Sequence, residues 1–404
     1  MSWAQVTFDS IIGSSAFGPR FSGDCYAEHG NVATLRTTDL SVDGVISLDT
    51  MPEANLDEAK YADHFLKIGD LVISRSGRIG TTAIFSGYHK PVLPGAFLIR
   101  FRLDPELAEP LFYRFFFNSA DGQQRLLSVA RGAAQQNISA TNVRTLKVPL
   151  PSIQEQRRIA DALSIYDGLI DNNRRRIKLL EEAARLLYRE WFVHMRFPGH
   201  EHVQVADGVP EGWKRLSIAD LFETTSGGTP SRAKAENFEG DINWVKTQEL
   251  DEHFIFNTEE HISEAALASS AAKLFPAGTL LVSIYGGSNI GRTGLLAKAS
   301  ASNQACVALM PKRKPGDVLF AQKWLQENRD YMIGLGQGAA QTNINQQTLR
   351  SQVLLVPDDR LLDEFIDSIQ PMYDQIATLG QQIDKLGQSR DLLLPRLMSG
   401  EVKV

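Results

Sequence analysis

The chain has 404 residues, 43% of them hydrophobic and 22% charged, so it is too long for one ordinary core and too apolar for wholesale disorder. No apolar run approaches the roughly 20 residues that span a bilayer, MSWAQVTFDS lacks the pattern of a signal peptide, and the two cysteines fall in different halves, so a cytoplasmic protein without membrane contact is expected. The formal net charge of −6 gives no global support for nucleic-acid binding, so any DNA site must be a local basic surface.

Residues 1–152 are expected to form a mixed α+β domain. Short β-branched segments punctuated by glycine and proline, such as DLVIS, AIFSG and TLKVPL, are typical of strands. The segment PLFYRFFFNSADGQQRLLSVA (Pro110–Ala130) has the apolar periodicity of a helix. Two polar segments, SRSGRIG and RGAAQQNIS, interrupt this domain, and their notable residues are Arg75, Ser76, Arg78, Arg131, Gln135, Gln136 and Asn137.

From Ile153 the chain becomes rich in Arg, Glu and Leu, which predicts one long helix over 153–196. Its apolar or small residues recur at alternating steps of four and three, a heptad pattern in which Asn173 fills one slot. A stripe of this length implies roughly 50–60 Å of helix, which outruns a domain of this size, so an intramolecular coiled coil is favoured over an amphipathic helix lying on a core. The slots are Ile159, Leu163, Tyr166, Ile170, Ile177, Leu180, Ala184, Leu187 and Trp191.

A linker over 197–212 follows, because proline and glycine in FPGHEHVQVADGVPEGW break the helix. It contains His200, Glu201 and His202, but three adjacent polar residues in a loop are a weak metal signal, and surface positions are the better interpretation. No metal site is expected.

The rest of the chain repeats what precedes it. GWKRLSIADLFETT (Gly212–Thr225) matches SWAQVTFDSIIGSS near the start, and QGAAQTNINQQTLRSQVLLVP (Gln337–Pro357) matches RGAAQQNISATNVRTLKVPLP at a nearly constant offset. A second mixed domain over 213–358 and a second long helix over 359–404 are therefore expected. If the two helices are antiparallel, the second returns the chain to the first domain, so the two termini should lie close together.

The second copy has its own polar residues and its own heptad stripe. GTLLVSIYGGSNIGRTGLL (Gly278–Leu296) corresponds to GDLVISRSGRIGTTAIF, and LFAQKWLQENRDYMIGL corresponds to the domain helix of the first copy. The polar residues are Tyr285, Asn289, Arg292, Thr293, Gln341, Asn343 and Asn345. The stripe is Phe365, Ile369, Met372, Ile376, Leu379, Ile383, Leu386 and Leu393, with Arg390 as a polar interruption that, like Asn173, could fix the register or face a partner.

No catalytic constellation is found. GGSNIGRT (Gly286–Thr293) fits the phosphate-loop template except that Arg292 replaces lysine, but the residues after it favour a strand where that template needs a helix. The Asn/Asp-Pro-Pro-aromatic tetrapeptide of amino-methyl transfer, G-x-S-x-G and H-E-x-x-H are all missing. No catalytic residue and no cofactor of its own are expected in this chain.

Two copies of one module joined by two long antiparallel helices would form a pseudo-dimer, whose pseudo-twofold symmetry fits duplex DNA. Gln and Asn can bond adenine edges and Arg can bond guanine, while glycine permits close backbone approach. The polar residues of both copies are therefore candidate DNA contacts. The alternative for each is an ordinary hairpin turn in which the amide side chains cap local backbone.

The whole chain resembles the specificity subunit of a type I restriction–modification system, which has the order recognition domain, long helix, recognition domain, long helix. The resemblance is carried by GDLVISRSGRIG, by the GAAQ-x-NI loop at Gly132 and again at Gly338, by PLPSIQEQRRIA (Pro149–Ala160) and by VPEGW (Val209–Trp213). The second half departs from the family pattern, with LVPDDRLLDE for PLPSIQEQ and SIYGGS for SRSG, which weakens transfer of individual residues there.

The resemblance implies a non-catalytic reader of bipartite double-stranded DNA. In this family each recognition domain reads one half-site through the major groove, the helices fix an unread spacer, and two modification (methyltransferase) subunits that carry S-adenosylmethionine dock on the helices. Restriction subunits that use ATP and Mg can join them. Two other classes stay open, a coiled-coil scaffold with two protein-binding heads and, less favoured, a fused methyltransferase or nuclease. The half-site sequences are not legible in the chain.

Overall fold

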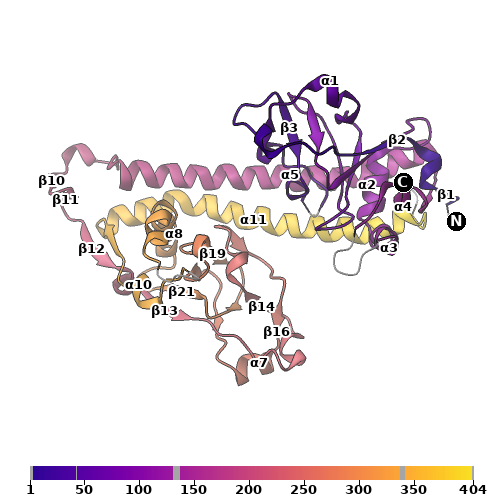
Figure 1. The fold of residues 1–404 in the computed structure, drawn as a ribbon. Helices are drawn as coiled ribbons and strands as arrows, with labels where there is room; N and C mark the ends of the chain where they lie inside the picture. The colour runs from indigo at the N-terminus through magenta and orange to yellow at the C-terminus, as the bar shows by residue number, and fades with distance from the viewer. Residues whose placement is uncertain (1–2, 42, 131–136, 337–341, 403–404) are drawn as a thin grey trace. The chain divides into compact units, whose positions relative to one another are not determined.

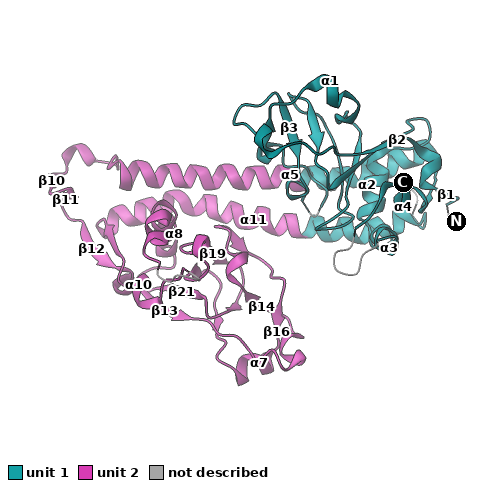
Figure 2. Ribbon diagram, viewed as in Figure 1, with its two compact units in different colours: residues 1–169, 385–404 teal, residues 170–384 magenta. Residues whose placement is uncertain are grey.

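The computed structural model describes residues 3–41, 43–130, 137–336 and 342–402, and the chain divides into two compact units (Figures 1 and 2). Unit 1 comprises residues 1–169 and 385–404, and unit 2 comprises residues 170–384. The division runs through both long helices, α5 (Ile153–Tyr188) and α11 (Asp359–Met398). The domain boundaries expected from the sequence separate helices from sheets, whereas each compact unit combines its sheets with a part of both helices.

Unit 1 is built on a four-stranded antiparallel sheet with strand order β2–β8–β5–β6. A three-stranded sheet, β4–β3–β7, and a two-stranded sheet, β1–β9, accompany it. The strands are β1 (Gln5–Thr7), β2 (Ile12–Phe17), β3 (Val32–Leu35), β4 (Glu53–Ala54), β5 (Leu71–Ser74), β6 (Thr82–Ile84), β7 (Val92–Pro94), β8 (Leu98–Leu103) and β9 (Lys147–Pro149). The helices are α1 (Glu58–Tyr61), α2 (Pro110–Asn118), α3 (Ala120–Ser128) and α4 (Ala140–Arg144).

Unit 2 repeats this plan, which confirms the internal repeat. Its sheets run β13–β21–β18–β19–β15 and β16–β14–β20–β17, and β12 pairs with β22 as β1 pairs with β9. Its strands are β10 (Val205–Ala206), β11 (Val209–Pro210), β12 (Lys214–Ser217), β13 (Phe222–Ser226), β14 (Ile242–Val245), β15 (Phe254–Ile255), β16 (His261–Ile262), β17 (Leu274–Phe275), β18 (Leu280–Ser283), β19 (Thr293–Leu296), β20 (Ser300–Ser302), β21 (Cys306–Pro311) and β22 (Val353–Val356). Its helices are α6 (Ile218–Leu221), α7 (Glu264–Ser269), α8 (Asp317–Glu327), α9 (Arg329–Gly334) and α10 (Gln346–Arg350).

The single helix predicted over Pro110–Ala130 is in fact two helices, α2 and α3, that meet at Ser119. This residue is extended, and its hydroxyl accepts a hydrogen bond from the N–H of Gly122 at 3.2 Å. In unit 2, Asn328 separates α8 from α9 at the equivalent point. The prediction was wrong because a short polar side chain offers the backbone a cap that competes with continuation of the helix.

The long helices are antiparallel, which confirms the arrangement expected for the intramolecular coiled coil. In unit 2, Asn173 of α5 donates to Gln382 of α11 at 3.2 Å, and Trp191, which follows α5, packs against Phe365 near the start of α11 with ring centroids 5.7 Å apart. The residue number therefore rises along one helix in the direction in which it falls along the other. The helix expected over 153–196 ends earlier, because α5 stops at Tyr188 and continues as a π-helical turn to Val193.

All of the predicted stripe residues are buried or half-buried, but they do not form one uniform seam. Ile159 and Leu163 join the core of unit 1, and Trp191 and Phe365 join the core of unit 2. Ile376 is only 2% exposed yet lies outside both of those cores. The stripe thus combines the two structures considered from the sequence, an amphipathic helix on a core at its ends and a helix pair between them.

Both ends of the described chain lie in unit 1, as the antiparallel arrangement predicts. Trp3 and Val402 pack against the core that contains Phe8, Phe101 and Phe117. The last turns of α11 also enter this core through Leu397 and Met398, which are both buried in it. The C-terminal helix therefore completes the hydrophobic core of the first unit.

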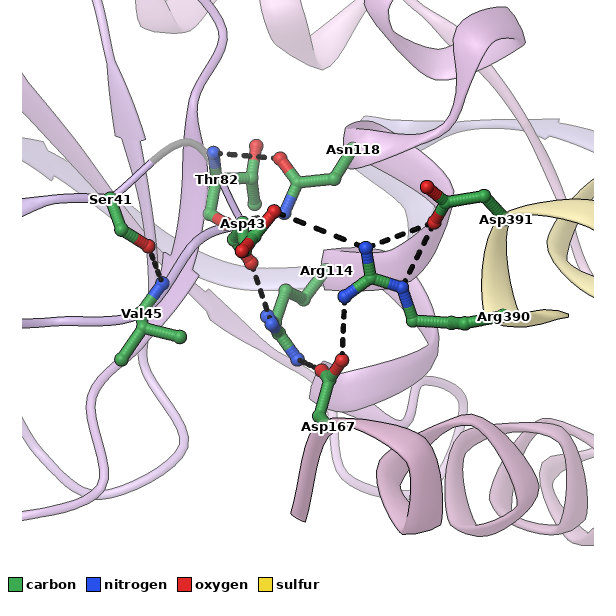
Figure 3. Close-up of polar contacts among 9 residues, drawn as sticks. All are labelled: Ser41, Asp43, Val45, Thr82, Arg114, Asn118, Asp167, Arg390 and Asp391. Carbon is green, nitrogen blue, oxygen red and sulfur yellow. Dashed lines mark hydrogen bonds and ion pairs between the residues drawn. The ribbon is translucent and has the colours of Figure 1, made fainter. Parts of the chain in front are cut away.

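Arg390, the polar interruption of the second stripe, anchors α11 within unit 1 (Figure 3). Its guanidinium bonds Asp167 of α5 at 2.8 Å, and Asp167 also bonds Arg114 of α2 at 2.8 Å. Arg114 in turn donates to the carbonyl of Asp43 at 2.6 Å. One carboxylate therefore ties α11, α5 and α2 together, which favours a role for the polar slot in fixing register over one in facing a partner.

A buried lysine lies where α8 meets both long helices in unit 2. Lys323 is 2% exposed, donates to Gln326 at 2.8 Å and lies 5.5 Å from the ring centre of Tyr373 on α11. Burial lowers the pKa of Lys323 to about 8, against the attraction of Glu181 on α5. The folded state therefore disfavours the charged lysine relative to the unfolded chain.

We expect the stability of unit 2, measured relative to the Lys323→Met variant, to rise between about pH 8 and pH 10. In this window the unfolded state holds the proton that folded Lys323 has released, so the free energy of unfolding increases with pH, by on the order of 2–3 kcal/mol. This free energy is measured by urea unfolding of both proteins, monitored through hydrogen exchange of amides in unit 2. The quantity compared is the difference between the two free energies of unfolding. Other buried groups, such as Cys306 with its raised pKa, lower stability as the pH rises, but they do so in both proteins and cancel in the difference. A difference independent of pH would contradict the assignment.

Candidate nucleic-acid interface

In unit 1, the glycine-containing segment predicted to touch DNA is the turn between β5 and β6. The hydroxyl of Ser74 holds this turn, because it donates to the carbonyl of Arg78 and accepts from the N–H of Thr81 at 3.1 Å. Gly77 and Gly80 have φ angles of 70° and 84°, which residues with a side chain rarely adopt. The turn is therefore a defined loop, and it presents Arg78 exposed to solvent.

The second polar segment lies against this turn although it is far away in the sequence. The N–H of Ile138 donates to the carbonyl of Arg75 at 3.1 Å, and the Ile138 side chain is buried in the core of unit 1. Asn137, directly before it, is half-buried. The fold thus brings the two predicted segments of the first copy together. Three of the predicted contacts, Arg131, Gln135 and Gln136, lie outside the described residues.

Unit 2 builds the same junction with a longer turn between β18 and β19. The N–H of Ile344 donates to the carbonyl of Ile284 at 2.9 Å, which reproduces the contact between Ile138 and Arg75. The turn presents Tyr285, which is 38% exposed, together with the half-buried Asn289 and Arg292. Gln341 of the adjoining loop lies outside the described residues.

Several of the predicted DNA contacts have structural roles in unit 2. Thr293 is fully buried in β19, where its hydroxyl donates to Glu252 at 2.6 Å. The side-chain oxygen of Asn343 accepts from the N–H of Gly286 at 3.0 Å, and Asn345 caps α10. Withdrawing these groups from their partners would cost free energy, so all three serve the fold. Only Asn345 matches the alternative of local backbone capping. In unit 1, Ser76 is 7% exposed and is similarly withdrawn from the surface.

Two phenylalanines that the sequence did not single out lie beside Arg75. The guanidinium of Arg75 lies 4.9 Å from the ring centre of Phe17, and the N–H of Arg75 donates to the carbonyl of Phe97 at 2.9 Å. Phe17 is 38% exposed and Phe97 is 55% exposed. Phenylalanine is common near the ends of strands, so nothing in the sequence indicated that these two side chains would be exposed.

The two units place different side chains on equivalent backbone positions. The N–H of Ile284 donates to the carbonyl of Ala305 at 2.9 Å, as Arg75 does to Phe97. The N–H of Gly227 donates to Cys306 as Gly18 does to Leu98, each at 3.2 Å. Arg75, Phe97 and Phe17 of unit 1 therefore correspond to Ile284, Ala305 and Ser226 of unit 2. One backbone frame thus presents two unlike surfaces.

Other kinds of site find no support in the structure. The segment Gly286–Thr293, which resembles a phosphate loop, leads into strand β19, so the helix that such a loop requires is missing, as predicted. Among the residues that the structure describes, no group of three His, Cys, Asp or Glu side chains could hold a metal ion. No helix in the same ranges has the length and apolarity to cross a membrane.

A duplicated frame that carries a polar surface in each copy, with each copy packed on a share of two antiparallel helices, defines a two-headed recognition protein. Residues 2–182 and 210–386 match the family described as "Type I restriction modification DNA specificity domain". The chain belongs to this family. It is a DNA specificity subunit of a type I restriction–modification system, the non-catalytic part of that enzyme.

Individual relatives are similar over most of the chain. The type I restriction enzyme MjaIX specificity subunit of Methanocaldococcus jannaschii is 24% identical over 309 residues, 74% of this chain and 70% of that protein. The HindI specificity subunit of Haemophilus influenzae is 22% identical over 358 residues, 73% of this chain and 78% of that protein. The solved S subunit of a type I restriction–modification system from M. genitalium covers 98% of this chain and 96% of its own at a TM-score of 0.58 and 16% identity, and it has the same fold.

Proposed function

We propose that each unit reads one half of a bipartite double-stranded DNA site. The observation that carries this proposal is the junction found in both units, where a glycine-containing turn meets a polar loop on one shared backbone frame. Arg78 on the first turn can bond a guanine edge, and Asn289 and Arg292 on the second can bond adenine and guanine. Because the side chains differ between the frames, the two half-sites differ in sequence.

The long helices fix the unread spacer between the half-sites and dock two modification subunits. Beside the stripe of heptad slots, α5 carries a second set of apolar residues that are between 45% and 69% exposed: Ile165, Leu169, Leu179 and Leu186. These four fall on one face of the helix at heptad-compatible spacing, and an exposed apolar stripe fits a partner helix. The modification subunits supply S-adenosylmethionine, and restriction subunits with ATP and Mg join the assembled complex.

Methylome sequencing of a host that carries this chain with its modification subunits tests the proposal. The expected result is one methylated motif with two specified halves and an unspecified gap. A complex that assembles but neither binds nor methylates DNA would instead support a protein-binding scaffold.

Substitutions in one turn are expected to alter one half-site only. Arg78→Ala should relax the half-motif read by unit 1, and Arg292→Ala the half-motif read by unit 2, because a bidentate base contact contributes about 1–3 kcal/mol of discrimination. A phosphate contact would instead weaken binding to all sequences and reduce the salt slope by about one unit. Methylomes and binding titrations of the two variants measure this, and each variant is the control for the other. Changes in both half-motifs from one substitution would contradict the assignment.

A further inference from the structure

We propose that Phe17, Phe97 and Arg75 form a base-reading platform in unit 1, here called the Phe–Arg platform. Arg75 bonds the edge of a guanine in the major groove, and the two phenyl rings pack on the neighbouring base pair. This inference rests on the proposed function, since it names side chains with which unit 1 reads its half-site.

Strand register places the platform on the face of the sheet that packs against the core, at the end of this face where the core no longer covers it. Ile99 of β8 pairs with Phe17 on one side and with Ile73 on the other, so the three side chains share one face of the sheet. Phe97 lies directly before β8 and Arg75 directly after β5, each two residues from the pair of Ile99 and Ile73. The bond from the N–H of Arg75 to Phe97 continues the strand pairing, so both residues fall on the same face. Ile73 and Ile99 are fully buried. The apolar surface continues past the core to the exposed rings of Phe97 and Phe17, which is typical of a surface that another molecule covers.

Arg75 is fixed in place, but its guanidinium has hydrogen-bonding capacity that the fold does not use. Its backbone is held by Phe97 on one side and Ile138 on the other, and its side chain lies over the ring of Phe17. Its Nε is buried and has no hydrogen-bond partner in the described part of the chain. A stacked, planar guanidinium is prepared for the bidentate contact that guanine O6 and N7 accept, and this contact offsets the desolvation of the arginine.

The fold does not require the Phe–Arg platform. At the equivalent positions of unit 2, Ile284 is 3% exposed and belongs to the core, Ala305 is 6% exposed, and Ser226 replaces the first phenylalanine. The same sheet therefore forms without exposed rings and without the arginine. The three residues also adjoin the turn with Arg78 and the loop with Asn137, so the platform extends the surface already proposed to meet DNA.

Binding of the full complex to duplexes with single base-pair changes, together with methylomes, tests the Phe–Arg platform. Arg75→Lys keeps the charge but loses the planar fork, and it should reduce the preference for the cognate over the substituted duplex by roughly 5- to 150-fold at one G·C pair. Phe17→Ala and Phe97→Ala should weaken the same half-site. The other half-motif and the gap should not change. Ile68→Ala is the matched control, since Ile68 is 79% exposed on the same unit but is no part of the platform.

Two results would overturn the Phe–Arg platform. Equal weakening on every duplex, with a shallower salt dependence, would make Arg75 a phosphate contact, and an unchanged motif in all three variants would remove the platform from recognition. Both results leave the proposed function standing if the wild type methylates a two-part motif, whereas a wild type with a one-part motif contradicts the proposed function itself. Phe97→Leu, which keeps apolar area without the ring, and thermal unfolding of each complex separate loss of recognition from loss of folding.

Discussion

Inserting seven residues into each long helix, after Asn173 and after Gln382, is expected to widen the gap of the methylated motif by roughly three base pairs. A full heptad keeps the apolar stripe in phase, and at about 1.5 Å per residue each helix becomes about 10 Å longer. B-DNA rises about 3.4 Å per base pair. The two insertion points suit the experiment because Asn173 bonds Gln382 at 3.2 Å, so both helices lengthen at the same level.

The identity of both half-motifs should survive this insertion, because the turns and loops that read DNA are unchanged. Three base pairs also rotate one half-site by about a quarter to a third of a turn, given about 10–10.5 base pairs per turn, so a lower level of methylation is expected. A two-residue insertion at the same points is the control, since it rotates the stripe by about 200° to the opposite face of the helix and should abolish assembly. Methylation at the original spacing would show that the helices are not the ruler, and altered half-motifs would place the reading surfaces outside the two units.

The long helices and the repeat could be predicted because both are properties of short-range pattern. The heptad residues from Ile159 to Trp191 recur at fixed steps, and the second copy repeats them with Phe365 and its successors. Two similar sequence segments also predict two similar sheets, which the matching strand orders confirm. The end of α5 was less predictable, because Trp191 is drawn into the core of unit 2 and the helix continues there as a π-helical turn.

Individual site residues were harder to predict because they depend on strand register and on contacts distant in sequence. Arg292 and Thr293 are adjacent, yet only Arg292 reaches the surface, since Thr293 begins β19 and its hydroxyl bonds Glu252. A one-residue shift of register would exchange the faces of the two side chains. Phe17 and Phe97 escaped notice for the same reason, since their place beside Arg75 exists only once β2, β8 and β5 have paired.

Replacing Asp167 with alanine is expected to destabilise unit 1 by about 3–5 kcal/mol, the range for removing one partner of a buried ion pair. Asp167 bonds both Arg114 and Arg390 at 2.8 Å, and the side chains of these arginines are only 9% and 15% exposed. Arg114 would therefore lose the carboxylate that it bonds, whereas Arg390 would keep Asp391 at 2.9 Å (Figure 3). The matched control is Glu182→Ala, which removes the partner of Arg185 from an exposed pair on α5 and should leave hydrogen-exchange protection nearly unchanged.

Hydrogen exchange is the suitable measurement for Asp167→Ala, because a chain of two units has no single well-defined free energy of unfolding. Amides of α2 and of the last turns of α11 should lose protection, while β18 and β21 of unit 2 keep theirs. The cost arises mainly from the buried charge of Arg114, so the triple variant Asp167→Leu, Arg114→Met, Arg390→Leu should recover most of the protection. It also places an apolar residue in the one charged slot of the second stripe. Equal loosening of both units, or a triple variant as unstable as Asp167→Ala, would mean that this cluster does not anchor α11.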